Sequence, residues 1–125
     1  MTHNKGRILE ENLREYLRKA EEAENDSAYN CAVTLYFKAM SVLADLFLLR
    51  KEGFIPSSHS QRFRMLRLKH KELYRIMDKD FPLYQKSYSL RMTKEHAKVL
   101  KDDFRKAKDN AGIKIRGKEV LQKEH

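Results

Sequence analysis

Arg91 and His96 lie five positions apart in the segment "SYSLRMTKEHAKVL" (87–100), with Thr93 between them. Threonine is a common N-cap, so Thr93 predicts a helix start with His96 in its first turn and Arg91 just before it. Free backbone N–H groups and the positive end of the helix dipole favour an anion there. An arginine can bind phosphate through two hydrogen bonds, and a histidine can exchange a proton with the ribose 2′-hydroxyl. The pair is therefore a candidate catalytic site for metal-independent RNA cleavage; the alternative is an ordinary capped helix start.

A second set of residues suited to phosphate is a row of cations on the helix predicted after residue 60. At about 100° per residue, these cations share a sector of roughly 120° opposite the apolar stripe. Such a row can follow a nucleic-acid backbone without reading its sequence, whereas a solvated face is the alternative interpretation. His59, in the loop before this helix, is either a capping residue or part of the same anion-binding surface. The predicted anion-binding cations are Arg64, Arg67, Lys71, Arg75 and Lys79.

The other histidine and cysteine positions give structural expectations. His70 lies on the apolar side of the same predicted helix, so we expect a hydrogen-bonded core or interface histidine. Cys31 is the only cysteine and lies in an apolar run, which predicts a buried, inert thiol and excludes a disulfide within the chain. HEXXH, CXXC and glycine-rich phosphate-loop patterns are absent, so we predict no metal and no cofactor.

The first helix that must position these residues is predicted from apolar side chains between Ile8 and Ala20. They recur at spacings of one, three and four, the pattern of an amphipathic helix. This helix is expected to end near residues 24–27, where a short polar side chain can cap the helix that follows. The expected caps are Asn25, Asp26 or Ser27.

The second predicted helix, about residues 27–51, is apolar on nearly every side, which is typical of the central helix of a bundle. Gly53 is expected to end it in the left-handed conformation. The helix is long enough to cross a bilayer, but Lys38 and Asp45 would each cost roughly 2.5–3.5 kcal/mol near the membrane centre. We therefore expect a buried bundle helix and no membrane span.

A third helix is expected to begin at Ser60 as N-cap and to carry one apolar stripe over about five turns, up to Met77. The segment "DKDFP" (78–82) is expected to break it because proline removes a helical hydrogen bond. A short turn or helix then covers residues 83–89. The fourth main helix is predicted from Thr93 to Gly112, which is expected to end it.

Together these elements predict an all-α, up-and-down bundle of four long helices plus one or two short ones over residues 1–112. Residues 113–125 form a basic tail, either a short docked helix or a loose segment. A chain of 125 residues, 41% hydrophobic and 36% charged, suits one small globular domain. The N-terminus becomes charged before an apolar signal segment forms, so we expect a cytoplasmic protein.

The net charge of +9 predicts a polyanionic partner. The charge is uneven, because residues 1–26 carry five basic and seven acidic side chains, whereas residues 53–80 carry seven basic and three acidic ones. Residues 93–125 carry ten basic and six acidic side chains. The apolar second helix and the spare apolar residues of the tail exceed what one small bundle needs, which favours a symmetric homodimer.

Three segments resemble the HEPN superfamily of helical domains. "AYNCAVTLYFKAMSVLADLFL" (28–48) is similar to its long second helix, and "GFIPSSHSQRFRML" (53–66) is similar to the following loop and helix start. "LYQKSYSLRMTKEHAKVLKDDFRKAK" (83–108) resembles the approach to and body of its last main helix. The resemblance covers about residues 5–110 and looks closest to small stand-alone archaeal members.

The resemblance implies a dimer of helical bundles in which an Arg-x4–6-His motif from both subunits cleaves RNA without a metal. Carried over, that motif is Arg91 and His96; active members usually have a polar residue after the arginine, where this chain has Met92. Other members bind nucleotides or pair with a small nucleotidyltransferase. We therefore expect a domain that binds RNA or nucleotide, with metal-independent ribonuclease activity; the alternative is a non-catalytic module that partners a nucleotidyltransferase.

Overall fold

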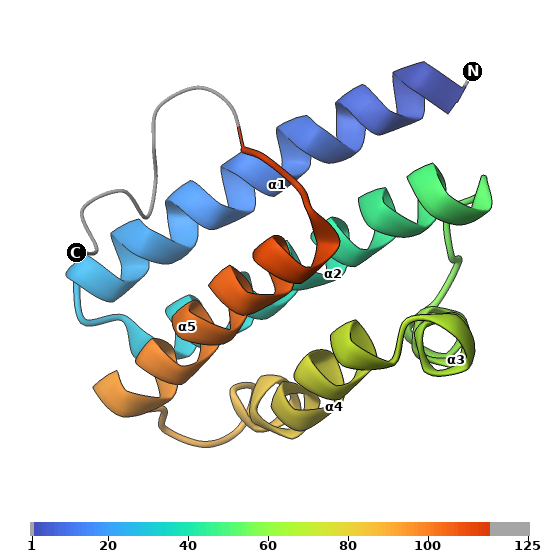
Figure 1. The fold of residues 1–125 in the computed structure, drawn as a ribbon. Coiled ribbons are helices and arrows are strands. Elements are labelled where there is room, and N and C mark those ends of the chain that lie inside the picture. The colour runs from blue at the N-terminus through green and yellow to red at the C-terminus, as the bar shows by residue number, and fades with distance from the viewer. Residues whose placement is uncertain (1, 116–125) are drawn as a thin grey trace.

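In the computed structural model, which describes residues 2–115, helices α1 (Thr2–Asn25) and α2 (Tyr29–Glu52) form an antiparallel pair (Figure 1). Helix α5 (Lys94–Ala111) packs against α2, and α4 (Lys71–Lys86) packs against both α2 and α5. The short helix α3 (His59–Lys69) has α4 as its main helix neighbour. The described residues contain no strand. The all-α prediction of four long helices and a short one is confirmed.

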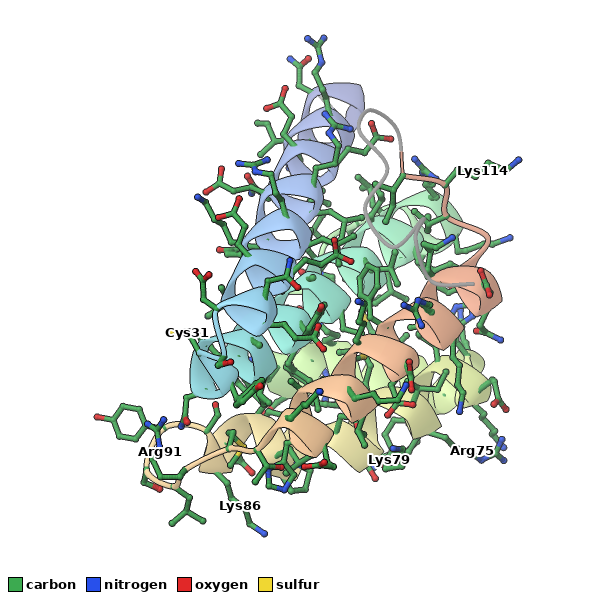
Figure 2. All side chains as sticks on the ribbon, turned by 90° about the vertical axis from the view of Figure 1, so that its left-hand side faces the viewer. Cys31, Arg75, Lys79, Lys86, Arg91 and Lys114 are labelled. Atoms are coloured by element: carbon green, nitrogen blue, oxygen red, sulfur yellow. The ribbon has the colours of Figure 1, made fainter. Side chains whose placement is uncertain are left out.

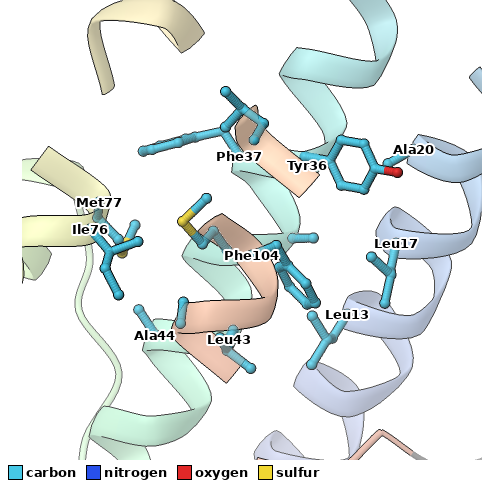
Figure 3. Packing of buried hydrophobic residues seen from close by; sticks show 14 of the residues in the cluster. Leu13, Leu17, Ala20, Tyr36, Phe37, Leu43, Ala44, Ile76, Met77 and Phe104 are labelled. Atoms are coloured by element: carbon cyan, nitrogen blue, oxygen red, sulfur yellow. The ribbon is translucent and has the colours of Figure 1, made fainter. Parts of the chain in front are cut away.

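Helix α2 lies at the centre of the bundle, as its apolar sequence predicts. Of its 24 residues, 14 are buried, and side chains from α1, α4 and α5 pack around it (Figure 3). Leu13 and Leu17 come from α1, Met77 from α4 and Phe104 from α5, each at most 2% exposed. On length and composition alone α2 would suffice to cross a membrane, but 78% of its most apolar window is buried inside the bundle. That burial is what a core helix of a bundle requires.

Three helix ends, at Gly53, Thr93 and Gly112, are those expected from the local sequence. Gly53 ends α2 with φ 91° and Gly112 ends α5 with φ 66°, both in the left-handed region that glycine tolerates. Thr93 caps α5, and its hydroxyl accepts the N–H of His96 at 3.2 Å. The start of α2 differs, because its N-cap is Ala28 and no side chain caps it.

The expected caps Asn25, Asp26 and Ser27 instead belong to the end of α1 and its turn. Ser27 takes φ 60°, and the backbone N–H of Ala28 donates to the carbonyl of Ala23 at 2.8 Å. These backbone hydrogen bonds satisfy carbonyls at the end of α1, so the three residues belong to its C-terminal turn and none of them is at the N-cap position of α2.

The predicted third helix is wrong in its length, because His70 divides it into α3 and α4. His70 has φ −137° and ψ 67°, and its Nε2 lies 3.0 Å from Glu52 Oε2. Its ring also meets the ring of Phe47 edge-on, with centroids 4.7 Å apart. These contacts with α2 hold the break and make His70 the bonded histidine that its position predicts. Hydrogen bonds from His70 and Lys69 lower the pKa of Glu52.

Both predicted boundaries of that helix are also corrected. Ser58, and not Ser60, is the N-cap of α3, and its hydroxyl accepts the N–H of Gln61 at 3.1 Å. At the other end, α4 continues through Pro82 to Lys86. An internal proline costs a helix about 3 kcal/mol. The side chains around it offset that cost, because Phe81, Leu83 and Tyr84 all pack partly buried against the core.

The turn between α4 and α5 is fixed by a side chain from the start of α2. Asn30 Nδ2 donates to the carbonyls of Ser87 at 2.8 Å and Leu90 at 2.6 Å. Its Oδ1 accepts the N–H of Met92 at 3.0 Å. One amide group therefore satisfies three backbone groups of the turn that carries Arg91.

The tail begins as a docked segment. Ile113 is 3% exposed and, together with Leu13 and Leu46, lines a small space of about 10 Å³. Residues 116–125 lie outside the described residues, and with them most of the predicted tail.

Candidate functional site

Arg91 and His96 have different surroundings at the start of α5. Arg91 is exposed in the turn, whereas the next residue, Met92, is 6% exposed and packs into the core. His96 completes a capping box, in which its Nδ1 accepts the N–H of Thr93 at 3.0 Å. Within residues 2–115, no hydrogen bond joins Arg91 to His96. Because Met92 is buried, the apolar residue after the arginine has a packing role.

The capping bond restricts what His96 can do. A neutral imidazole has one N–H and one nitrogen that accepts. Because Nδ1 accepts from Thr93, the proton of the neutral ring is on Nε2, which can only donate. In this conformation His96 can donate to an anion, and it can take a proton only after the cap opens.

The predicted row of cations is not one surface, because the break at His70 reorients the helix. Arg64 and Arg67 belong to α3, whereas Arg75 and Lys79 belong to α4. Figure 2 shows Arg75 and Arg91 at opposite sides of the molecule, with Lys79 between them. Lys71, the first residue of α4, is exposed and lines neither of the grooves described below.

An open groove of about 490 Å³ lies between α3 and α4, called here the α3–α4 groove. Arg64 and Arg67, the arginine pair, are both exposed and make no ion pair among residues 2–115. The groove has one carboxylate, Asp78, which likewise has no cation partner in that range. Its lining consists of His59, Ser60, Phe63, Arg64, Arg67, Tyr74, Asp78 and Phe81.

Three half-buried aromatic side chains line this groove: Phe63, Tyr74 and Phe81, called here the ring wall. Phe63 meets Tyr74 at 87° with centroids 6.2 Å apart, and meets Phe81 at 68° and 5.2 Å. Edge-to-face packing of this kind fixes the rings against one another. The groove therefore joins free cations to a rigid aromatic surface.

A buried ion pair anchors α3 beneath the groove. Arg62 is 8% exposed and reaches Asp45 of α2, with Nε to Oδ1 at 2.7 Å and Nη2 to Oδ2 at 3.1 Å. Its Nη1 lies 2.7 Å from His59 Nδ1. Arginine only donates, so His59 Nδ1 accepts and the proton of the neutral ring is on Nε2. Partial burial, with the positive charges of Arg62 and Lys38, lowers the pKa of His59, which favours the neutral ring.

A second open groove, of about 460 Å³, lies between α4 and α5 and is called here the α4–α5 groove. Arg75 Nη1 lies 3.2 Å from Glu72 Oε1, and Lys79 Nζ lies 2.7 Å from Asp103 Oδ2. Lys106 is also within 3.9 Å of Asp103. The lining consists of Glu72, Arg75, Ile76, Lys79, Asp103, Lys106, Asp109 and Asn110. Its three cations face three carboxylates, so the predicted cations here are compensated.

Asp80 is a buried carboxyl beside Lys79, one of the cations that line the α4–α5 groove. It is 1% exposed, and its Oδ1 lies 3.2 Å from Lys79 Nζ. Burial, followed by the neighbouring Asp103 carboxyl, raises the pKa of Asp80 to about 7. The Asp103 carboxylate in turn raises the pKa of Lys79, which stays charged and bound within this cluster.

The structure thus brings together only part of the predicted anion-binding set: His59, Arg64 and Arg67. The sequence did not indicate that Phe63, Tyr74 and Phe81 line a groove. The Asp45–Arg62 pair was also missed, although a carboxylate inside an otherwise apolar helix requires a cation nearby.

Cys31 corrects another expectation. It is exposed near the start of α2, at the edge of the molecule in Figure 2, and is not a buried thiol.

The described residues contain no group of three histidine, cysteine or carboxylate side chains arranged to hold a metal ion. No family model, curated protein or solved structure matches the chain.

Proposed function

We propose that this protein is a HEPN-like cytoplasmic domain that binds RNA or a nucleotide through the α3–α4 groove. The observation that carries the proposal is the arginine pair, Arg64 and Arg67, which is exposed beside the ring wall and makes no ion pair among the described residues. Phosphate needs a cation that is not already neutralised, and a base needs an aromatic side chain that is accessible in part. Both features meet here.

The energetic argument follows from the same two features. Each phosphate contact releases counterions, so binding through two arginines weakens steeply with salt. Stacking of a base on an aromatic side chain contributes about 1–3 kcal/mol and depends little on salt. The net charge of +9 adds long-range attraction without choosing a site.

The ribonuclease activity that the HEPN resemblance implies is a separate question. Cleavage at Arg91 would require His96 to release Thr93 before it could take a proton. Binding at the α3–α4 groove requires no such rearrangement, and the geometry therefore favours binding over cleavage.

The test is the affinity of a fluorescent single-stranded RNA 12-mer, measured by anisotropy between 50 and 200 mM salt. We expect Arg64→Ala with Arg67→Ala to weaken binding about tenfold or more at low salt and to lower the salt slope by roughly two. The matched control is Arg75→Ala with Lys106→Ala, which removes the same charge from the α4–α5 groove, where both cations have carboxylate partners.

We expect the control pair to weaken binding less than about threefold, because those phosphate contacts would first have to displace a carboxylate. Equal losses in the two double variants would show that only the overall charge matters. Absence of binding by the wild-type protein to RNA and to free nucleotides would reject the proposal.

A further inference from the structure

The α3–α4 groove contains more than a phosphate site requires. Cations alone would suffice for a duplex backbone, yet much of this lining is aromatic. The ring wall is half-buried and lines an open space, so part of its surface is available to a ligand. In a duplex the base faces are stacked on one another and cannot reach a protein ring, whereas the bases of single strands can.

His59 adds a neutral donor to the same groove. The bond from Arg62 Nη1 occupies Nδ1, so the ring is held with its proton on Nε2. The ring centroid also lies 5.5 Å from that of Phe81, which fixes the imidazole next to the ring wall. A neutral N–H beside an aromatic surface suits an acceptor atom on a nucleotide, and its hydrogen bond is little affected by salt.

The size of the groove limits the ligand. Small-molecule sites in proteins are roughly 300–1,000 Å³, and about 490 Å³ falls inside that range. Such a space holds one nucleotide unit, whereas a duplex would lie across the surface without entering it.

Resting on the proposed function, we infer that the α3–α4 groove holds a single unpaired nucleotide unit of a strand. The base of this unit stacks on the ring wall, and its phosphate binds the arginine pair. His59 Nε2 donates a hydrogen bond to an acceptor atom of the same nucleotide unit. Because this site binds an unpaired base, the protein selects single-stranded over double-stranded RNA.

The chain contains no tryptophan, so one introduced tryptophan reports on one place. The test variant is Tyr74→Trp in the ring wall. The matched control is Tyr88→Trp, which is 95% exposed on the turn that carries Arg91. Each is titrated with a single-stranded RNA 8-mer, the same sequence as a duplex, and an abasic ribose-phosphate 8-mer, while anisotropy records how much strand is bound.

We expect the single strand to quench Tyr74→Trp at least twofold and to leave Tyr88→Trp unchanged. The abasic strand should bind at least fivefold more weakly than the single strand and should not quench at saturation, because it offers phosphate without a base. Binding that depends on the arginine pair but leaves Tyr74→Trp unquenched would overturn this inference and keep the proposed function. Quenching of Tyr88→Trp alone would overturn both, since the strand would then lie at the start of α5.

A second pair of variants keeps the test independent of folding at position 74. His59→Leu removes the donor, whereas His59→Gln supplies an amide N–H in its place. We expect about fivefold weaker single-strand binding for His59→Leu with an unchanged salt slope, and near wild-type binding for His59→Gln. Equal affinities for all three proteins would show that His59 makes no contact with the nucleotide.

Discussion

The two grooves that flank α4 have nearly the same size, about 490 and 460 Å³. They differ in whether the cations that line them are paired with carboxylates. The α3–α4 groove holds two arginines against one carboxylate, and no ion pair is formed between them. The α4–α5 groove holds three cations against three carboxylates, most of them in contact. A cation predicts anion binding only when the fold leaves it without a carboxylate, which a count of charges along the chain does not reveal.

The largest expected effect concerns the support of the α3–α4 groove. Arg62→Ala leaves Asp45 buried without its cation, so we expect the free energy of unfolding to fall by about 3–5 kcal/mol. Urea denaturation measures this loss. Arg64→Ala, an exposed arginine two residues away, should change stability by less than about 0.5 kcal/mol. Similar stabilities for the two variants would contradict a structural division between Arg62 and the arginine pair.

The α4–α5 groove should respond to pH through Asp80. Its pKa of about 7 in the folded protein lies above the usual carboxyl value of 3.8, so the folded state binds the extra proton. The free energy of unfolding should therefore fall as pH rises from 5 to 8, by about 2 kcal/mol. The free energy of unfolding of Asp80→Asn should match that of the wild type near pH 5 and exceed it at pH 8.

Thermal or urea unfolding at both pH values measures the effect of Asp80. The difference between wild type and Asp80→Asn isolates it, because every other ionisable side chain is present in both proteins. A pH-independent difference would mean that Asp80 is ionised throughout and that Lys79 fully compensates it.

The comparison can also be reversed by freeing cations in the α4–α5 groove. Glu72→Gln with Asp109→Asn removes two exposed carboxylates and releases Arg75 from its partner. We expect RNA affinity at low salt to rise about threefold to tenfold, with a steeper salt slope. Glu11→Gln with Glu15→Gln on α1 is the charge-matched control and should change affinity less. Equal gains would indicate that the effect is only one of net charge.

The smallest expected effect lies at the third candidate region, the start of α5. His96→Ala removes one half of the capping box and should cost about 0.5–1 kcal/mol of stability without changing RNA affinity. The same protein tests the ribonuclease hypothesis. If that hypothesis holds, wild-type protein cleaves RNA in EDTA, spares DNA of the same sequence, and loses cleavage in both His96→Ala and Arg91→Ala.

Features determined by a few neighbouring residues could be predicted from the sequence. The ends of α2 and α5 at Gly53 and Gly112 and the cap at Thr93 each depend on the conformation of one residue and its nearest neighbours. The continuous apolar run likewise predicts the burial of α2. These features fix the fold class without any knowledge of how the helices meet.

Features determined by contacts between distant residues could not be predicted in the same way. His70 breaks the third helix where it meets Glu52 of α2, and Pro82 stays inside α4 because its neighbours pack on the core. The helical-wheel pattern treated Arg64 and Arg75 as neighbours on one face. The break separates them into two grooves, so three of the six predicted anion-binding residues, Lys71, Arg75 and Lys79, lie outside the α3–α4 groove for a reason of tertiary structure.

The hydrogen bonds between Asn30 and the turn between α4 and α5 have a consequence for proteolysis. Arg91 is an exposed arginine in a connecting turn, which by sequence and exposure is a preferred tryptic site. A protease must draw several residues into an extended strand, and here that would break bonds from Asn30 to Ser87, Leu90 and Met92 together. Cleavage after Arg91 should therefore proceed only through local unfolding, so the rate of tryptic nicking there reports the population of the open α4–α5 turn when reclosing is faster than cleavage.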